Sequence, residues 1–239
     1  RIQLSRSSWL NSSTGMICSC ACGVRAFCLS LAPMQGAGLT ARELYCRRGD
    51  RPLFGGLDLA LKPGEALHLV GPNGIGKSSL IEILAGLRRP SDFLSAGGAK
   101  LVRGSVEWSG SVGLLDGRLA LDETVTLERA LAFWAALDGS EASTADHARD
   151  LGIEPLMDVP VRYLSTGQRK RAGIARLLGQ NADHWLLDEP LNGLDTESIG
   201  TVERLIAARR DAGGVVVVAS HQSIAMPGAV TLDLRDHPC

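Results

Sequence analysis

The sequence has no long hydrophobic run, few aromatic residues and little excess of charge of either sign. None of its stretches approaches the roughly 20 consecutive apolar residues that a transmembrane helix needs, so we predict no membrane-spanning segment in this chain. The formal net charge is −1, which gives no indication of nucleic-acid binding, and we expect none. Aromatic residues make up 4% and charged residues 21% of the 239 positions, a composition typical of an α/β protein.

Acidic residues are absent from the first 42 positions, where serine and arginine are frequent. This composition is typical of a mitochondrial transit peptide. The alternative, which we favour, is an over-extended reading frame or a cloning remnant, with translation beginning at Met34. In either case we expect residues 1–36 to be a disordered or spurious extension of the folded domain.

The six cysteines follow no pattern that predicts a metal site or a disulfide framework. Cys18, Cys20, Cys22 and Cys28 lie in the amino-terminal segment, and the first three are too tightly spaced for the usual paired zinc ligands. The other two cysteines look isolated. Their pattern therefore favours a reducing compartment.

From Leu39 onward, apolar runs alternate with amphipathic stretches. Residues 53–70 predict two strands separated by the turn signal KPG, and the run VVVVAS at 215–220 is typical of a central parallel strand. Such alternation predicts a mostly parallel sheet that is covered on both faces. The remaining predictions are strands at 184–188 and 230–234, helices at 79–87, 123–139, 165–179 and 201–214, and loops with weak strand or short helical turns at 91–110 and 141–163.

The stretch GPNGIGKS at 71–78 satisfies the pattern G-x-x-x-x-G-K-[ST] between a predicted strand and a predicted helix. In such a loop, backbone N–H groups wrap the phosphates of a nucleotide, Lys77 reaches the β- and γ-phosphates, and Ser78 supplies a hydroxyl ligand for Mg²⁺. The sequence therefore predicts that ATP and Mg²⁺ bind here. The nucleotide-binding candidates are Gly71, Pro72, Asn73, Gly74, Ile75, Gly76, Lys77, Ser78 and Ser79.

A hydrophobic strand that ends in carboxylates completes such a site, and HWLLDEP at 184–190 has this form. Asp188 is expected to hold Mg²⁺ through water, and Glu189 is expected to polarise the attacking water. Glu189 and Lys77 are thus catalytic candidates, whereas Ser78 and Asp188 are the candidate metal ligands.

A second helix start suited to phosphate lies in LSTGQ at 164–168. Ser165 and Thr166 are good N-cap residues, and Gly167 leaves the backbone bare where helical N–H groups have no partner. These donors make a potential anion site. Together with the phosphate loop and the carboxylate strand, the stretch resembles the signature motif of ATP-binding-cassette (ABC) ATPases.

This resemblance implies that the active site is shared between two chains. In the family, two cassettes meet head to tail, and the signature of each caps the γ-phosphate held by the other, which gives nucleotide contacts to Ser165, Gly167 and Gln168. The stretch LNGLD matches the D-loop and ends in Asp195, near the implied dimer interface. His221 matches the switch histidine, which contacts the γ-phosphate and helps to position the water, and it is therefore a third catalytic candidate.

The resemblance also implies an α/β fold, the P-loop NTPase of the ABC ATPase type. Its RecA-like core has a mixed or parallel sheet and carries a small helical subdomain. The ABC domain is then expected at 37–239, with the helical subdomain at about 118–180.

Two features usual in this family are missing. No glutamine occurs between Gln35 and Gln168, so Leu115 or Asp116 stands where the family has a loop glutamine. The position of the adenine-stacking aromatic residue is occupied by Arg48, and Tyr45 comes too early in the chain. An arginine guanidinium can also stack on a base.

More narrowly, the stretch ARELYCRRGDRPLFGGLDLAL at 41–61 resembles the opening of the CcmA family, the ATPase subunits of the haem-exporter complex of cytochrome c maturation. The resemblance implies ATP hydrolysis that drives release of a haem-loaded chaperone. It also implies integral membrane partners of the CcmB and CcmC type. The expected location is peripheral, at the cytoplasmic face of a bacterial inner membrane or, alternatively, at the matrix side of the mitochondrial inner membrane.

Other functions share parts of this pattern. A generic ABC transporter ATPase for a lipid, drug or metal complex has the same catalytic residues, and only the 41–61 stretch argues against it. A soluble non-transport ABC protein acting on ribosomes or DNA usually has two cassettes or long insertions with basic arms. A P-loop kinase leaves the signature and His221 unexplained.

Overall fold

The computed structural model describes residues 38–94, 101–139 and 144–238, which all belong to one compact unit, Gln35–Cys239. The predictions for residues 1–36 and for five of the six cysteines lie outside the described residues. Cys46 is described and is a buried free thiol. None of the described helices is long and apolar enough to cross a membrane.

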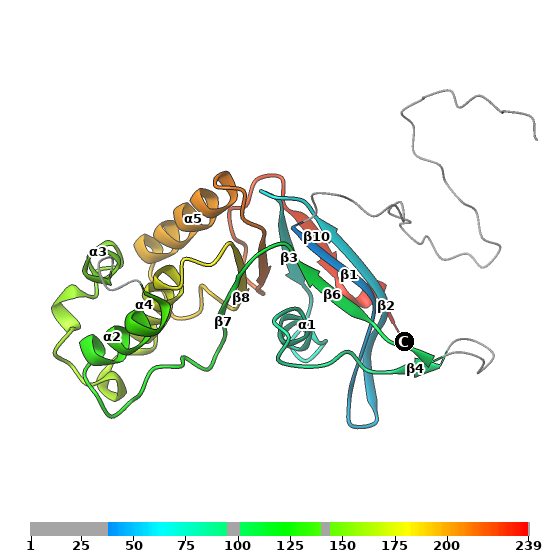
Figure 1. Cartoon of the computed structure of the whole chain (residues 1–239), viewed down its shortest axis with the longest axis horizontal. Helices are drawn as coiled ribbons and strands as arrows, with labels where there is room; N and C mark the ends of the chain where they lie inside the picture. Colours follow the sequence, from blue (N-terminus) through cyan, green and yellow to red (C-terminus); the bar gives the residue numbers. More distant parts are fainter. Residues whose placement is uncertain (1–37, 95–100, 140–143, 239) are drawn as a thin grey trace, which may run out of the picture. The chain divides into compact units, whose positions relative to one another are not determined.

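A five-stranded sheet in the order β10-β3-β9-β8-β7 forms the centre of this unit, and every neighbouring pair in it is parallel (Figure 1). β9 is buried along its whole length and lies between β3 and β8, which confirms the predicted central parallel strand. The strands are β3 (Ala66–Val70), β7 (Val112–Leu115), β8 (His184–Asp188), β9 (Val216–Ala219) and β10 (Val230–Asp233).

A separate antiparallel sheet in the order β2-β1-β6 was only partly predicted. β1 has an irregular register with β2, and Glu43 takes a positive φ of 50° while its N–H donates to the Asp58 carboxylate at 2.7 Å. This irregularity interrupts the alternation by which a strand is identified. The strands are β1 (Leu39–Arg48), β2 (Arg51–Leu61) and β6 (Ser105–Trp108), and a two-stranded pair consists of β4 (Phe93–Leu94) and β5 (Leu101–Val102).

The helices overlap their predicted ranges, but α1 ends three residues earlier and α2 begins four residues later than predicted, and the start of α5 differs most. α5 begins at Thr196 rather than at residue 201, because the Asp195 side chain caps it by accepting a hydrogen bond from the Ser198 N–H at 2.8 Å. The helices are α1 (Lys77–Leu84), α2 (Leu127–Asp138), α3 (Thr144–Asp150), α4 (Thr166–Gly179) and α5 (Thr196–Asp211), with short 3₁₀ turns at Glu154–Leu156, Val161–Tyr163 and Leu234–Asp236. α2, α3 and α4 pack against one another (Figure 1), whereas the expected subdomain boundary at about 118–180 stays a prediction.

Alternating side chains of the parallel strands fill two separate apolar clusters, one on each face of the sheet. Leu186 and Val217 pack with α1, β1 and β2, whereas Trp185, Leu187 and Val218 pack with α2, α4 and α5. Burial on both faces explains why these strands read as continuous apolar runs rather than as alternating patterns.

Leu186 offers a direct test of this core because its side chain is 0% exposed in β8. We expect Leu186→Ala to cost about 3 kcal/mol and to lower the Tm by about 6–12 °C, since it removes buried methyl groups and leaves a cavity. Leu87→Ala is the matched control, because Leu87 is 68% exposed and should shift the Tm little. Thermal unfolding followed by circular dichroism measures both, and equal shifts would contradict the position of the core.

Candidate active site

The phosphate loop connects β3 to α1 and is built on three glycines with positive φ. Gly71, Gly74 and Gly76 have φ values of 122°, 79° and 121°, a region that other residues rarely adopt. A Cβ on Gly76 would also lie 3.2 Å from the Phe54 ring. Gly76 is the N-cap of α1 and provides no side-chain cap, so the first N–H groups of that helix can serve an anion.

The Lys77 side chain folds back into this loop. Its ammonium donates to the Gly71 carbonyl at 2.6 Å and to the Pro72 carbonyl at 3.3 Å, and the residue is only 6% exposed. The charge is therefore held where phosphate oxygens could replace the two carbonyls as acceptors.

A cavity of about 330 Å³ opens beside the loop. Arg48 of β1 and Leu53 of β2 are among its lining residues, whereas Tyr45 stacks on Phe93, with ring centroids 4.4 Å apart. The sequence did not identify Leu53, because nothing distinguishes it from a core leucine. The lining residues are Arg48, Leu53, Asn73, Gly74, Gly76, Lys77, Ser78, Ser79 and Glu189.

Asp188, the last residue of β8, has the properties of a metal-holding carboxylate. Its Oδ1 is buried and has no hydrogen-bond partner among the described residues. Burial raises the pKa of Asp188, while a hydrogen bond with the Ser78 side chain lowers it. An unpartnered carboxylate oxygen next to a hydroxyl is a suitable donor set for Mg²⁺, so both predicted ligands fit this ion.

Glu189 follows Asp188 and is in contact with His221. The backbone of Glu189 has a positive φ of 47°, and its N–H donates to the Ala219 carbonyl of β9 at 2.8 Å. His221 Nδ1 lies 2.8 Å from Glu189 Oε2. An ionised carboxylate can only accept, so the imidazole donates in this contact. Two predicted catalytic residues that are distant in the sequence are thus brought together.

The predicted signature residues lie at the start of α4 and not around this cavity. Ser165 and Gln168 form a capping box, in which the Ser165 N–H donates to Gln168 Oε1 at 2.8 Å and the Gln168 N–H donates to Ser165 Oγ at 3.3 Å. Gly167 lies against the Gly193 carbonyl of the predicted D-loop. Neither this helix start nor Asp195 contributes to the cavity lining among the described residues.

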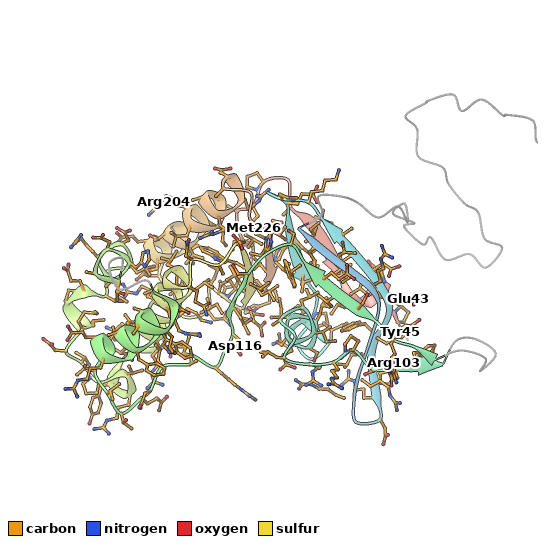
Figure 2. All side chains as sticks on the ribbon, in the orientation of Figure 1. Glu43, Tyr45, Arg103, Asp116, Arg204 and Met226 are labelled. Carbon is orange, nitrogen blue, oxygen red and sulfur yellow. The ribbon has the colours of Figure 1, made fainter. Side chains whose placement is uncertain are left out.

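The two residues at the expected glutamine position differ in their surroundings. Leu115 is the last residue of β7 and is 3% exposed in the core. Asp116 lies on the connection from β7 to α2 (Figure 2), and its Oδ1 accepts a hydrogen bond from the Arg118 N–H at 2.9 Å. Asp116, rather than the buried Leu115, is therefore the residue that presents a polar side chain at this position.

Comparison with known proteins identifies a family for this fold and site. The family described as ABC transporter matches residues 54–192. The cytochrome c biogenesis ATP-binding export protein CcmA of Novosphingobium aromaticivorans is 50% identical over 85% of this chain and 98% of its own length. The CcmA protein of Rhodospirillum rubrum is 45% identical over 86% of this chain and 88% of its own.

Solved structures agree on the fold. An ABC transporter ATP-binding protein from Pyrococcus furiosus has a TM-score of 0.68 and 21% identity, and the match covers 84% of this chain and 99% of that protein. The protein cbiO1 from Clostridium perfringens, part of the ABC transporter complex cbiONQ, has a TM-score of 0.61 and 24% identity over 79% of this chain and 80% of its own.

The contact between Gly167 and Gly193 leads to a prediction for the signature helix. A Cβ at position 167 would collide with the Gly193 carbonyl, so we expect Gly167→Ala to cost about 1–3 kcal/mol as the helix and the loop move apart. Gly117→Ala is the matched control, because nothing lies within 4 Å of a Cβ there and its φ is not positive. Thermal unfolding of both variants is the measurement, and an unchanged Tm for Gly167→Ala would contradict the close approach.

Proposed function

This chain belongs to the CcmA family of ABC transporter ATPases, and we propose that it is the ATP-hydrolysing subunit of a haem-exporter complex in c-type cytochrome biogenesis. The observation that carries the proposal is the convergence of the phosphate loop, Asp188 and the Glu189–His221 pair at the carboxyl ends of β3, β8 and β9. The relatives' name, a cytochrome c biogenesis ATP-binding export protein, supports the biological role.

In the proposed reaction, the phosphate loop binds and orients ATP. Its N–H groups and the Lys77 ammonium hold the β- and γ-phosphates, and Arg48 stacks on or beside the adenine. Ser78 and Asp188 would hold Mg²⁺, which neutralises charge on the phosphates when it is bound.

Glu189 acts on the attacking water. The water oxygen bonds to the γ-phosphorus, the bond from this phosphorus to the oxygen retained by ADP breaks, and Glu189 takes up a proton of the water. His221 donates to Glu189 at 2.8 Å and thereby orients the carboxylate. Its side chain is 50% exposed, so it can also contact the γ-phosphate.

The complete site needs two copies of the chain, which are proposed to meet head to tail. Ser165, Gly167 and Gln168 do not line the cavity of their own chain, and they lie in the first turn of α4, where helical N–H groups suit a phosphate. In the dimer they contact the ATP of the other copy, and Asp195 lies near the interface.

The proposed complex also contains integral membrane subunits of the CcmB and CcmC type, and ATP hydrolysis drives the release of a haem-loaded chaperone. The subunit is expected at the cytoplasmic face of a bacterial inner membrane, and the matrix side of the mitochondrial inner membrane is the alternative. The two CcmA relatives named above are from bacteria, which supports the first location.

Replacement of the proposed base tests the shared site. Glu189→Gln should still bind ATP but hydrolyse it at least about 100-fold more slowly, because an amide cannot take up the proton. The trapped closed dimer should double the mass measured by light scattering with ATP. Combining Glu189→Gln with Lys77→Ala removes nucleotide binding and should keep the chain monomeric. A monomeric Glu189→Gln variant with the wild-type rate would show that Glu189 is not the base.

The biological role is tested in a bacterial strain that lacks its own maturation ATPase. The wild-type chain, co-expressed with its cognate membrane subunits, should restore c-type cytochromes on a haem-stained gel, whereas Lys77→Ala should not. Lys62→Ala is the control, since Lys62 is an exposed lysine outside the site. Failure of the wild-type chain, with all subunits expressed at the membrane, would favour an ABC transporter for another cargo.

A further inference from the structure

Lys170 is a buried cation that the proposed reaction does not use. It lies on α4 and is only 8% exposed. Its side chain forms no hydrogen bond or close ion pair with any other residue in the described part of the chain. Burying a charge is costly unless opposite charge compensates it, so the surroundings of Lys170 must provide that compensation.

The face of α4 that carries Lys170 is pressed against β7. Gly173, which is one helical turn further along, approaches Leu115 and Leu119 so closely that a Cβ there would collide with both side chains. Residues three apart share one face of a helix, so Lys170 lies on this same side, near the carboxyl end of β7.

Carboxylates gather at this end of the sheet. β7 and β8 are parallel, and Leu115 pairs with Leu187. Asp116, which follows β7, and Asp188, the last residue of β8, therefore lie at the same edge of the sheet, with Glu189 next in the chain. Asp116, Asp188 and Glu189 together are called the carboxylate edge below.

Lys170 is electrostatically coupled to all three members of this edge. Burial lowers the pKa of Lys170, while the charges of Asp188, Glu189 and Asp116 raise it. The effect on Asp188 is reciprocal, because burial, Glu189 and Asp116 raise its pKa and Lys170 lowers it.

Other cations near the edge are engaged elsewhere. The Lys77 ammonium is bound by the carbonyls of the phosphate loop. The Arg176 guanidinium lies over the Trp134 ring, 3.8 Å from its centroid. Lys170 is the buried cation of α4 whose side chain has no such partner.

We propose that Lys170 is the resident counter-ion of the carboxylate edge, a positioning residue that keeps Asp188 and Glu189 together until the metal–nucleotide complex binds, a role that rests on the proposed ATPase function. Without Lys170, three neighbouring carboxylates repel one another and the site opens. Because Lys170 and Mg²⁺ are both drawn to the same carboxylates, the lysine also weakens the binding of the ion. Lys170 thereby links the position of α4, which carries the signature residues, to whether Mg²⁺ is bound at the site of the same chain.

The test is the Mg²⁺ concentration that gives half-maximal binding of a fluorescent ATP analogue to the purified full chain. Lys170→Met should lower this concentration by roughly threefold to tenfold, since a competing positive charge is lost, and should also lower the Tm measured without metal. Lys170→Arg keeps the positive charge, so its half-maximal Mg²⁺ concentration and its Tm without metal should stay close to those of the wild type. Lys62→Met, at an exposed position, should change neither. A loss of packing alone would lower the Tm equally with and without Mg²⁺ and would overturn the proposal.

Asp116→Asn gives a second measurement that does not depend on the folding of the Lys170 variant. It removes one carboxylate but leaves the lysine, so the half-maximal Mg²⁺ concentration should rise severalfold. In the double variant the half-maximal Mg²⁺ concentration should lie between those of the two single variants, because the two shifts have opposite signs. An unchanged value for Asp116→Asn would overturn the proposal. Failure of the wild-type chain itself to bind the analogue would instead contradict the proposed ATPase function, and the counter-ion role with it.

Discussion

The parallel pairing of β3, β9 and β8 is the constraint on which the rest of the structure depends. Parallel strands end at a common edge, so groups from distant parts of the sequence meet there: the phosphate loop after β3, Asp188 at the end of β8 with Glu189 after it, and His221 after β9. The pairing is maintained by apolar clusters on both faces of the sheet rather than by the polar groups at its edge. The edge can therefore accommodate the unpartnered Oδ1 of Asp188 and the positive φ of Glu189. Both features cost free energy of folding, which the apolar core offsets.

Helix α4 approaches its neighbours closely at two glycines. Gly167 lies against the carbonyl of Gly193, in the loop between β8 and α5, and Gly173 lies against the side chains of Leu115 in β7 and Leu119, so a side chain at either position would collide. Close packing transmits small displacements, because interiors of this density have few alternative arrangements. The close contacts at Gly167 and Gly173 therefore fix α4 against both the end of β7 and the loop after β8.

Features with strict local chemistry could be predicted from the sequence, whereas those that depend on tertiary proximity could not. The local residue types alone predict the phosphate loop from its glycines and the strands β8 and β9 from their apolar runs. Both strands are confirmed. β1 was missed because the irregularity at Glu43 breaks its alternation, and the start of α5 was wrong because Asp195 was interpreted only as a D-loop residue and not as an N-cap. The assignments of individual site residues to ATP, Mg²⁺ and the second chain stay predictions.

Lys170 illustrates why part of a site escapes prediction from sequence. In RKR at 169–171 it reads as one of three solvated charges on a helix face, and only the crossing of α4 over β7 turns that position inward. The absence of a glutamine near residue 116 is likewise ambiguous in the sequence, since a carboxylate in place of a neutral amide adds a negative charge to an edge that already has two. The inward position of Lys170 and the carboxylate in place of the glutamine have one physical explanation when they are considered together. A third carboxylate beside Asp188 and Glu189 raises the repulsion at the edge, and a buried cation on the facing helix offsets it.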